Sequence, residues 1–238
     1  MPKEKERVLL SWSGGKDSAF ALHEMRKSQE FEIVALLTAI TENDERVTMH
    51  RVNRDVLEAQ ARAVDLPLDI VVLPQVCNNC EYTERMYAAL RRHQAHGIRL
   101  VAFGDLFLDD IRDFREEYLE AIGMEAHFPL WHRDTKELAY AFVNQKFKAV
   151  VTCVDSEMLP SSYAGRAYDR AFLADLPLNV DPCGENGEFH TFVYDGPIFN
   201  QPLPLKLGEQ THDEHFHYCE ITSRSRRARP LLVRARMS

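Results

Sequence analysis

The sequence predicts an α/β fold in which helices cover a parallel sheet. Apolar runs of strand length alternate with stretches whose apolar residues recur at helical spacing. The runs are nearly continuous, as is typical of strands buried on both faces of a parallel sheet. Strands are expected at residues 8–10, 31–37, 68–73 and 100–103, and helices at 19–25, 51–64 and 82–96. Ligands bind beyond the carboxyl ends of such strands, so the loops there are the first place to look for function.

A smaller α+β domain is expected in the second half of the chain. Gly123 suits the end of the helix that follows the fourth strand, and Pro129 interrupts the next apolar segment. Asp134 then starts a capping pattern for another helix, and residues 149–155 form a further strand. We therefore expect a nucleotide-binding domain at 5–127, a substrate-binding domain at 128–222 and a basic, solvated or disordered tail at 223–238.

The composition is that of an ordinary globular protein. The chain has 238 residues, of which 45% are hydrophobic and 28% charged, and no apolar run approaches the length of a membrane span. The charged N-terminus does not resemble a secretory signal. The odd number of five cysteines predicts free thiols and not a disulfide framework. A cytoplasmic protein without membrane contact is expected, and the sequence leaves a homo-oligomer open. The net charge of -8 disfavours broad binding of nucleic acids.

The first candidate site is the strand–turn–helix stretch of residues 11–18. Backbone N–H groups at a helix start lack internal partners, and a glycine pair lets them approach an anion. A Walker loop is excluded, because Asp17 follows Lys16 where a hydroxyl should bind magnesium. A plain turn between strand and helix is the alternative. The candidate ligands of a phosphate here are Ser11, Ser13, Gly14, Gly15, Lys16, Asp17 and Ser18.

Three later loops also carry candidate residues. His50 and Arg51 could face a nucleotide or simply begin a solvated helix. Cys77 and Cys80 could be half a zinc site, a redox couple, a sulfur relay or a pair without a role. Gly104 and Asp105 end the fourth strand, where Gly104 would allow close approach of a ligand and Asp105 could hold a metal.

The helix that follows this fourth strand carries many charges. Asp109, Arg112 and Glu116 share one face of it by their spacing. For Asp113, Arg115 and Glu117 we expect a solvated face of ion pairs.

A last motif lies in residues 181–191. Glycines at 184 and 187 surround two carboxylates three residues apart, so that Glu185, Glu188 and His190 could crowd around one polar substrate group. The alternative is a hairpin turn. Farther on, His212, His215 and His217 could hold a metal or, by our preference, lie on the surface.

Together these motifs resemble a known family. The S-G-G-K-D-S loop is similar to that of the PP-loop ATP pyrophosphatases, in which chemistry at the α-phosphorus of ATP yields AMP and pyrophosphate. Paired with G-D, R-x-x-R, P-L-W and G-E-x-G-E-x-H-T, it resembles the diphthine–ammonia ligase family over about residues 7–200. Residues 49–52 and 181–183 resemble a bacterial-type branch, for which the acceptor would differ because bacteria do not make diphthamide.

The resemblance implies a fold, a reaction and a set of ligands. The fold would be the adenine nucleotide α-hydrolase (HUP-like) type, and ATP would adenylate a carboxylate that ammonium then amidates. Asp17, Glu185, Glu188 and His190 would be catalytic, and Asp17 and Asp105 would hold Mg²⁺. A tRNA sulfurtransferase using Cys77, Cys80 or Cys183 and a non-catalytic ATP sensor are the alternatives.

Overall fold

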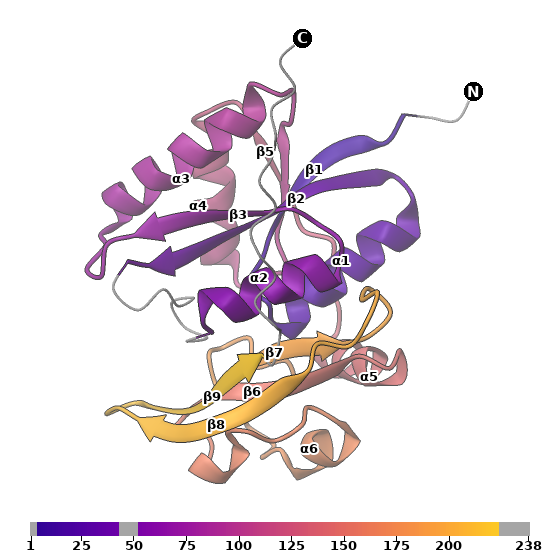
Figure 1. Ribbon diagram of the computed structural model, residues 1–238, viewed down its shortest axis with the longest axis vertical. Coiled ribbons are helices and arrows are strands. Elements are labelled where there is room, and N and C mark those ends of the chain that lie inside the picture. Colours follow the sequence, from indigo (N-terminus) through magenta and orange to yellow (C-terminus); the bar gives the residue numbers. More distant parts are fainter. Residues whose placement is uncertain (1–3, 43–51, 224–238) are drawn as a thin grey trace.

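The apolar runs of the first half form one five-stranded parallel sheet. The computed structural model describes residues 4–42 and 52–223 (Figure 1). The strands lie in the order β3-β2-β1-β4-β5. Their bounds are Glu6–Ser11 for β1, Phe31–Thr41 for β2, Leu68–Leu73 for β3, Leu100–Ala102 for β4 and Glu125–His127 for β5. The helices that connect them are α1 (Lys16–Ser28), α2 (Arg54–Ala63), α3 (Asn79–Gln94) and α4 (Asp109–Glu120).

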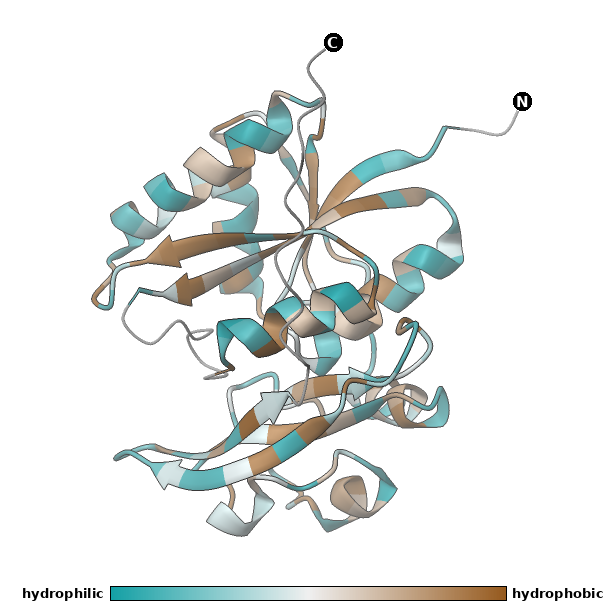
Figure 2. Cartoon of the chain, viewed as in Figure 1, coloured by the Kyte–Doolittle hydropathy of each residue, from teal (hydrophilic) through white to brown (hydrophobic). Residues whose placement is uncertain are grey.

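Both faces of this sheet are buried, which explains the continuous apolar runs. Successive side chains of a strand point to opposite faces. Val8 and Leu10 accordingly pack in the apolar cluster that contains α1 and α2, while Leu9 packs in the cluster that contains α3 and α4. Figure 2 shows the strands of this sheet as mostly hydrophobic, whereas the helices carry hydrophilic residues as well.

The second half forms a smaller antiparallel sheet with strand order β7-β6-β9-β8. Its strands are β6 (Lys148–Asp155), β7 (Phe189–Asp195), β8 (Leu205–His212) and β9 (Phe216–Ser223). The helices α5 (Thr135–Asn144) and α6 (Arg170–Asp175) and the 3₁₀ turn η1 (Ser161–Tyr163) accompany it. The predicted fold class, a parallel α/β domain with a smaller α+β domain, is confirmed.

The two sheets share one apolar core. Helices α1 and α2 lie between them in Figure 1, and Phe20, Leu57 and Phe192 belong to a single buried cluster that spans both halves. The division at residues 127 and 128 stays a prediction, because this core continues across it. The tail at 224–238 lies outside the described residues.

Several elements differ from the sequence prediction. Helix α3 begins earlier than expected because Asn78 caps it: the Asn78 side chain accepts the Glu81 N–H at 2.9 Å, and the Glu81 carboxylate accepts the Asn78 N–H at 3.2 Å. Strands β5, β8 and β9 were not predicted. In β8 nearly every residue is exposed, so no apolar run marks it. Of the described helices, none is long and apolar enough to cross a membrane.

The sheet topology creates a crevice beside β1. Strand β1 lies between β2 and β4, and the chain leaves β1 toward α1 on one face of the sheet but leaves β4 toward α4 on the other. The loops after β1 and β4 therefore diverge at the carboxyl edge, which is where α/β sheets bind ligands. Near their starts the two loops are in close contact at Gly104, where only a residue without a side chain fits, since a Cβ there would lie 2.8 Å from the carbonyl carbon of Asp17.

We expect Gly104→Ala to destabilise the protein. The added methyl group would also lie 2.9 Å from the Ser18 nitrogen, so backbone must move at a cost of about 1–3 kcal/mol. Gly208→Ala is the matched control, because that glycine also lacks a positive φ and its added methyl group would come no closer than 3.1 Å to Glu220 Cβ and 3.4 Å to the Glu220 carbonyl oxygen in the exposed hairpin. Urea denaturation measures both changes, and equal stability of the two variants would contradict the steric argument.

Candidate functional site

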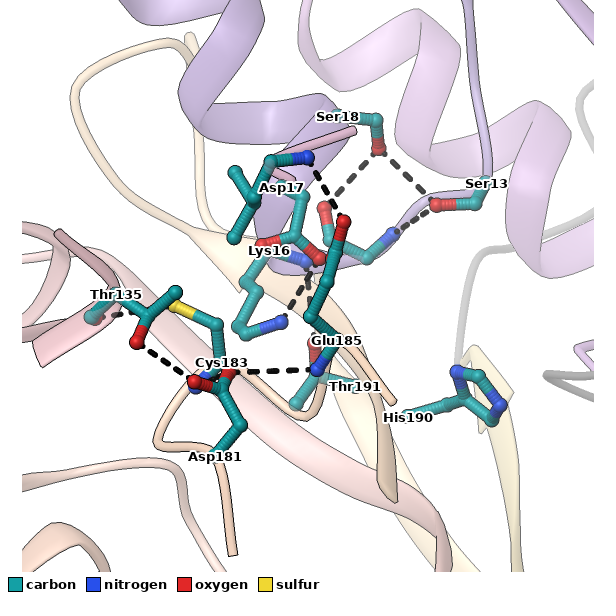
Figure 3. Close-up of polar contacts among 12 residues, drawn as sticks. Ser13, Lys16, Asp17, Ser18, Thr135, Asp181, Cys183, Glu185, His190 and Thr191 are labelled. Carbon is teal, nitrogen blue, oxygen red and sulfur yellow. Dashed lines mark hydrogen bonds and ion pairs between the residues drawn. The ribbon is translucent and has the colours of Figure 1, made fainter. Parts of the chain in front are cut away.

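The loop between β1 and α1 is shaped to receive an anion. Gly15 precedes α1 in an extended conformation and, as a glycine, offers no capping side chain of its own. Ser13 Oγ accepts the Gly15 N–H at 3.2 Å and lies 3.3 Å from Ser18 Oγ. The Ser18 hydroxyl also donates to the Gly15 carbonyl at 3.1 Å. These bonds hold the two hydroxyls beside the free helix start, as Figure 3 shows.

The second sheet supports this loop from below. The carbonyl of Gly14 accepts the Val193 N–H at 3.0 Å, and the Lys16 N–H donates to Thr191 Oγ1 at 3.1 Å. Gly14 has a φ of +79°, and a Cβ there would lie 2.8 Å from Gln60 Oε1. Strand β7 and helix α2 thus fix the backbone of the loop.

Lys16 and Asp17 form an ion pair at the start of α1. Their Nζ and Oδ2 atoms lie 2.8 Å apart, and Lys16 is only 5% exposed. Burial alone would lower the pKa of Lys16, but the Asp17 carboxylate outweighs it and the net pKa is raised. Asp17 Oδ1 is buried and has no hydrogen-bond partner within residues 4–42 and 52–223. That oxygen is available to a ligand.

Asp105 is held by an arginine that the sequence analysis placed in solvent. Arg115 lies 2.8 Å from Asp105 through Nε and donates from Nη2 to the other oxygen at 3.0 Å. Its guanidinium stacks 4.3 Å from the centre of the Phe103 ring. The expected solvated face is therefore wrong for Arg115, although Asp113 and Glu117 are exposed. Arg112 instead pairs with Glu116 and packs against Phe128 and Trp131.

Glu185 reaches across from the second half of the chain. Its Oε1 accepts the Leu106 N–H at 2.8 Å, directly after β4. Burial, followed by the negative charge of Asp17, raises the pKa of Glu185 to about 7, against the opposing effects of the Leu106 N–H and Lys16. A carboxylate with a pKa near neutrality can both take up and release a proton at physiological pH.

Glu188 has a different position from the one predicted. It is 2% exposed, and its Oε1 accepts the Asp181 N–H and the Asn186 side-chain amide, both at 3.0 Å. Its Oε2 accepts the Asn186 N–H at 3.0 Å. The carboxylate is turned into its own loop and does not line the cavity described below. Glu188 thus fastens the loop that carries Glu185, and its predicted catalytic role stays a prediction.

A cavity of about 840 Å³ joins these groups. It is bounded by the loops after β1, β3 and β4, the starts of α3 and α4, and the loop before β7. The predicted site residues that line it are Ser11, Ser13, Lys16, Asp17, Ser18, Gly104, Asp105, Glu185 and His190. Gly14 and Gly15 shape the turn but do not line the cavity. The His190 ring lies apart from Asp17 and Glu185 in Figure 3.

The cysteines occupy separate environments. All five are free thiols. Cys183 is buried and donates to the Thr135 carbonyl at 3.3 Å, and burial raises its pKa. Cys77 lines the cavity, while Cys80 is exposed.

Two other groups of predicted residues contribute no described site. His50 and Arg51 lie outside the described residues. His212 and His217 face each other across the β8–β9 hairpin. No metal-binding group of three or more His, Cys, Asp or Glu side chains occurs in the part of the chain that the structure describes.

Comparison with known proteins decides the family. A model described as the diphthamide synthase N-terminal domain matches residues 6–126, and one described as the diphthamide synthase C-terminal domain matches residues 134–227. The chain belongs to the diphthamide synthase family. This confirms the resemblance to diphthine–ammonia ligases and places the chain among ligases of the ATP pyrophosphatase type.

Relatives of this family are similar over most of the chain. The diphthine–ammonia ligase of Schizosaccharomyces pombe is 26% identical over 90% of this chain, which spans 38% of that protein. The enzymes named diphthine–ammonia ligase of Homo sapiens and Rattus norvegicus are 25% and 24% identical over 85% of this chain and 84% of theirs. A U34-tRNA thiolase structure from Methanococcus maripaludis aligns with a TM-score of 0.36 and 16% identity, covering 59% of this chain and 56% of that one.

We expect Glu188→Gln to disturb the loop without removing the titrating group of the site. The new amide nitrogen would face an N–H donor, leaving a buried hydrogen bond unmade at a cost of about 1–3 kcal/mol. Thermal unfolding should show this loss of stability. Asn186→Ala removes only the side-chain partner and is the milder control. A variant as stable as the wild type would contradict the structural role of Glu188.

Proposed function

We propose that the protein adenylates a carboxylate with ATP and converts the acyl-adenylate to an amide with ammonia. The observation that carries the proposal is the meeting of two groups in one cavity. The anion-receiving loop of residues 13–18 comes from the first half, and Glu185, with a pKa of about 7, comes from the second. One fits the departure of pyrophosphate and the other fits proton transfer from ammonium.

ATP would place its β- and γ-phosphates at the start of α1. The hydroxyls of Ser13 and Ser18 supply donors for phosphate oxygens, and the positive end of the α1 dipole attracts them. Gly104 and Ser11 line the same cavity at the carboxyl edge of the sheet, where the nucleoside would extend. Contributions of His50 and Arg51 stay a prediction.

The residues present suit Mg²⁺ bound together with phosphate. Mg²⁺ is usually held by one or two carboxylates and by substrate phosphates. Asp17 offers the buried Oδ1 that has no hydrogen-bond partner among the described residues. Asp105 offers a second oxygen of this kind, because its Oδ2 is buried without a hydrogen-bond partner among the described residues, although it lies 2.8 Å from Arg115 Nε. Both aspartates therefore fit this role. A bound Mg²⁺ would neutralise charge on the pyrophosphate.

The reaction then follows from the positions of the protein groups. An oxygen of the acceptor carboxylate attacks the α-phosphorus, and the bond to the bridging oxygen breaks as pyrophosphate leaves. The loop stabilises the negative charge that develops on that leaving group. Glu185 in its carboxylate form takes a proton from ammonium, and the ammonia attacks the acyl carbon. The bond between that carbon and the AMP oxygen then breaks, AMP leaves, and the second proton lost from nitrogen passes to solvent. Glu188 holds the loop that carries Glu185.

The acceptor is a carboxylate whose identity stays open. Relatives are named for diphthine and ammonia, and we carry over ammonia and the type of reaction. A sulfurtransferase that uses Cys183 is less well supported, because Cys183 is buried with a raised pKa, the reverse of a reactive thiolate. A sulfurtransferase that uses Cys77 and Cys80 stays the alternative, since Cys77 lines the cavity. A sensor would bind ATP without releasing AMP for any carboxylate.

Asp17→Asn should abolish conversion of ATP to AMP and pyrophosphate. The substitution keeps the shape of the side chain but removes the charge that pairs with Lys16 and suits Mg²⁺. Pyrophosphate release in the presence of ammonium and a panel of carboxylates measures the effect. Asp113→Asn, on the exposed face of α4, should retain full turnover. Intact turnover in Asp17→Asn would refute the assigned site.

Glu185→Gln should separate the two half-reactions. Exchange of labelled pyrophosphate into ATP should persist, whereas amide formation should fall about 100-fold because the proton acceptor is lost. In the wild type, kcat/KM for amidation should decline below about pH 7, where Glu185 becomes protonated. The variant should lack this acidic limb. A wild-type profile that is flat from pH 5 to 8 would exclude Glu185 as the base.

A further inference from the structure

A fully buried glutamine joins the loop to both halves of the molecule. Gln60 lies on α2 with 0% exposure. Its Nε2 donates to the carbonyls of Gly14 at 2.9 Å and Val193 at 2.6 Å, and its Oε1 accepts the Trp12 indole N–H at 2.8 Å. Both amide hydrogens are therefore used, and the indole fixes which end of the amide faces the carbonyls.

This arrangement determines the orientation of the peptide between Gly14 and Gly15. The Gly14 carbonyl is held by two donors, Gln60 Nε2 and the Val193 N–H. A peptide bond is planar and trans, so its N–H points opposite to its carbonyl. With the carbonyl held toward the core, the Gly15 N–H must point toward the cavity side, where it meets Ser13 Oγ at 3.2 Å.

The orientation of the Gly15 N–H determines whether the Ser13 hydroxyl can donate a hydrogen bond to a ligand. Ser13 lines the cavity. Because its oxygen accepts the Gly15 N–H, its own hydrogen is free to be donated to Ser18 Oγ or to an oxygen of a bound anion. Without Gln60, Gly14 keeps one donor instead of two, and its positive φ leaves the glycine peptide free to rotate.

We infer that Gln60 is a positioning residue for the pyrophosphate part of the nucleotide. It acts through the Gly14 carbonyl and Ser13 and touches no substrate itself. The inference rests on the proposed function, because it presumes that the loop binds the leaving group. Helix α2 then has a specific role: through Gln60 it makes the anion-receiving shape of the loop depend on the packing of α2 against β7.

The test compares two ligands on the free protein. Titration calorimetry measures the dissociation constants for magnesium pyrophosphate and for AMP, which lacks the leaving group. Gln60→Met should weaken pyrophosphate binding about tenfold, as expected for one lost charge-assisted hydrogen bond, while AMP binding changes less than about twofold. Trp12→Phe keeps Gln60 but removes the donor that orients its amide. This variant should therefore also raise the ratio of the dissociation constant for magnesium pyrophosphate to that for AMP.

A control on the same helix separates positioning from loss of stability. Val56 is buried in α2 and contributes to the apolar core, so Val56→Ala should lower the unfolding temperature and leave the ratio of the two dissociation constants unchanged. If Gln60→Met fails to fold, Trp12→Phe supplies the comparison.

The outcomes distinguish the inference from the proposed function. Equal weakening of both ligands in Gln60→Met and Trp12→Phe, or no weakening, would overturn the inference alone. A wild-type protein that binds neither ligand would overturn the proposed function and the inference together.

Discussion

The carbonyl of Gly14 is the point on which the two halves of the molecule converge. It lies in the loop after β1, and it accepts hydrogen bonds from β7 and from Gln60 on α2. A buried carbonyl requires partners, so the loop holds its shape only while α2 and β7 are packed beneath it. The apolar core that spans both sheets supplies this packing. Ligand binding at the loop is therefore tied to the docking of the second sheet.

Burial and the balance of charge in the cavity together explain the raised pKa of Glu185. Among the described residues, Lys16 and Arg115 line the cavity, and each is engaged by a carboxylate: Lys16 by Asp17, and Arg115 by Asp105. No ion pair engages Glu185 among the described residues, and its carboxylate lies near those negative groups. Burial, followed by the negative charge of Asp17, favours the neutral form and raises the pKa of Glu185 to about 7. A cation such as ammonium or Mg²⁺ would reverse this preference, so the protonation of Glu185 responds to the contents of the cavity.

Sequence reasoning identified the fold, and most of the candidate site residues that it named line the cavity, because these follow from local patterns. Apolar runs and the glycine turn placed β1, α1 and the anion-receiving loop, and the resemblance placed Glu185 opposite them. Gln60 carries no local signal, since one polar residue in a helix usually faces solvent. Arg115 and Glu188 were misplaced because only tertiary contacts decide whether a charged side chain is solvated, paired or turned into its own loop. Strand β8 was missed because its exposed residues show no alternation.

The segment that joins the two halves takes part in building the site. The Leu106 N–H donates to Glu185, while the Leu106 carbonyl accepts the His132 N–H at 2.8 Å. His132 adopts a φ of +57° and follows Trp131, which packs against Arg112 of α4. The connection is thus held by α4 and by the loop after β4. Because Leu106 contacts the connection through its carbonyl and Glu185 through its N–H, a shift of the second sheet would move Glu185 and the cavity wall together. The connection therefore holds the Glu185 carboxylate in a fixed position relative to the loop after β4.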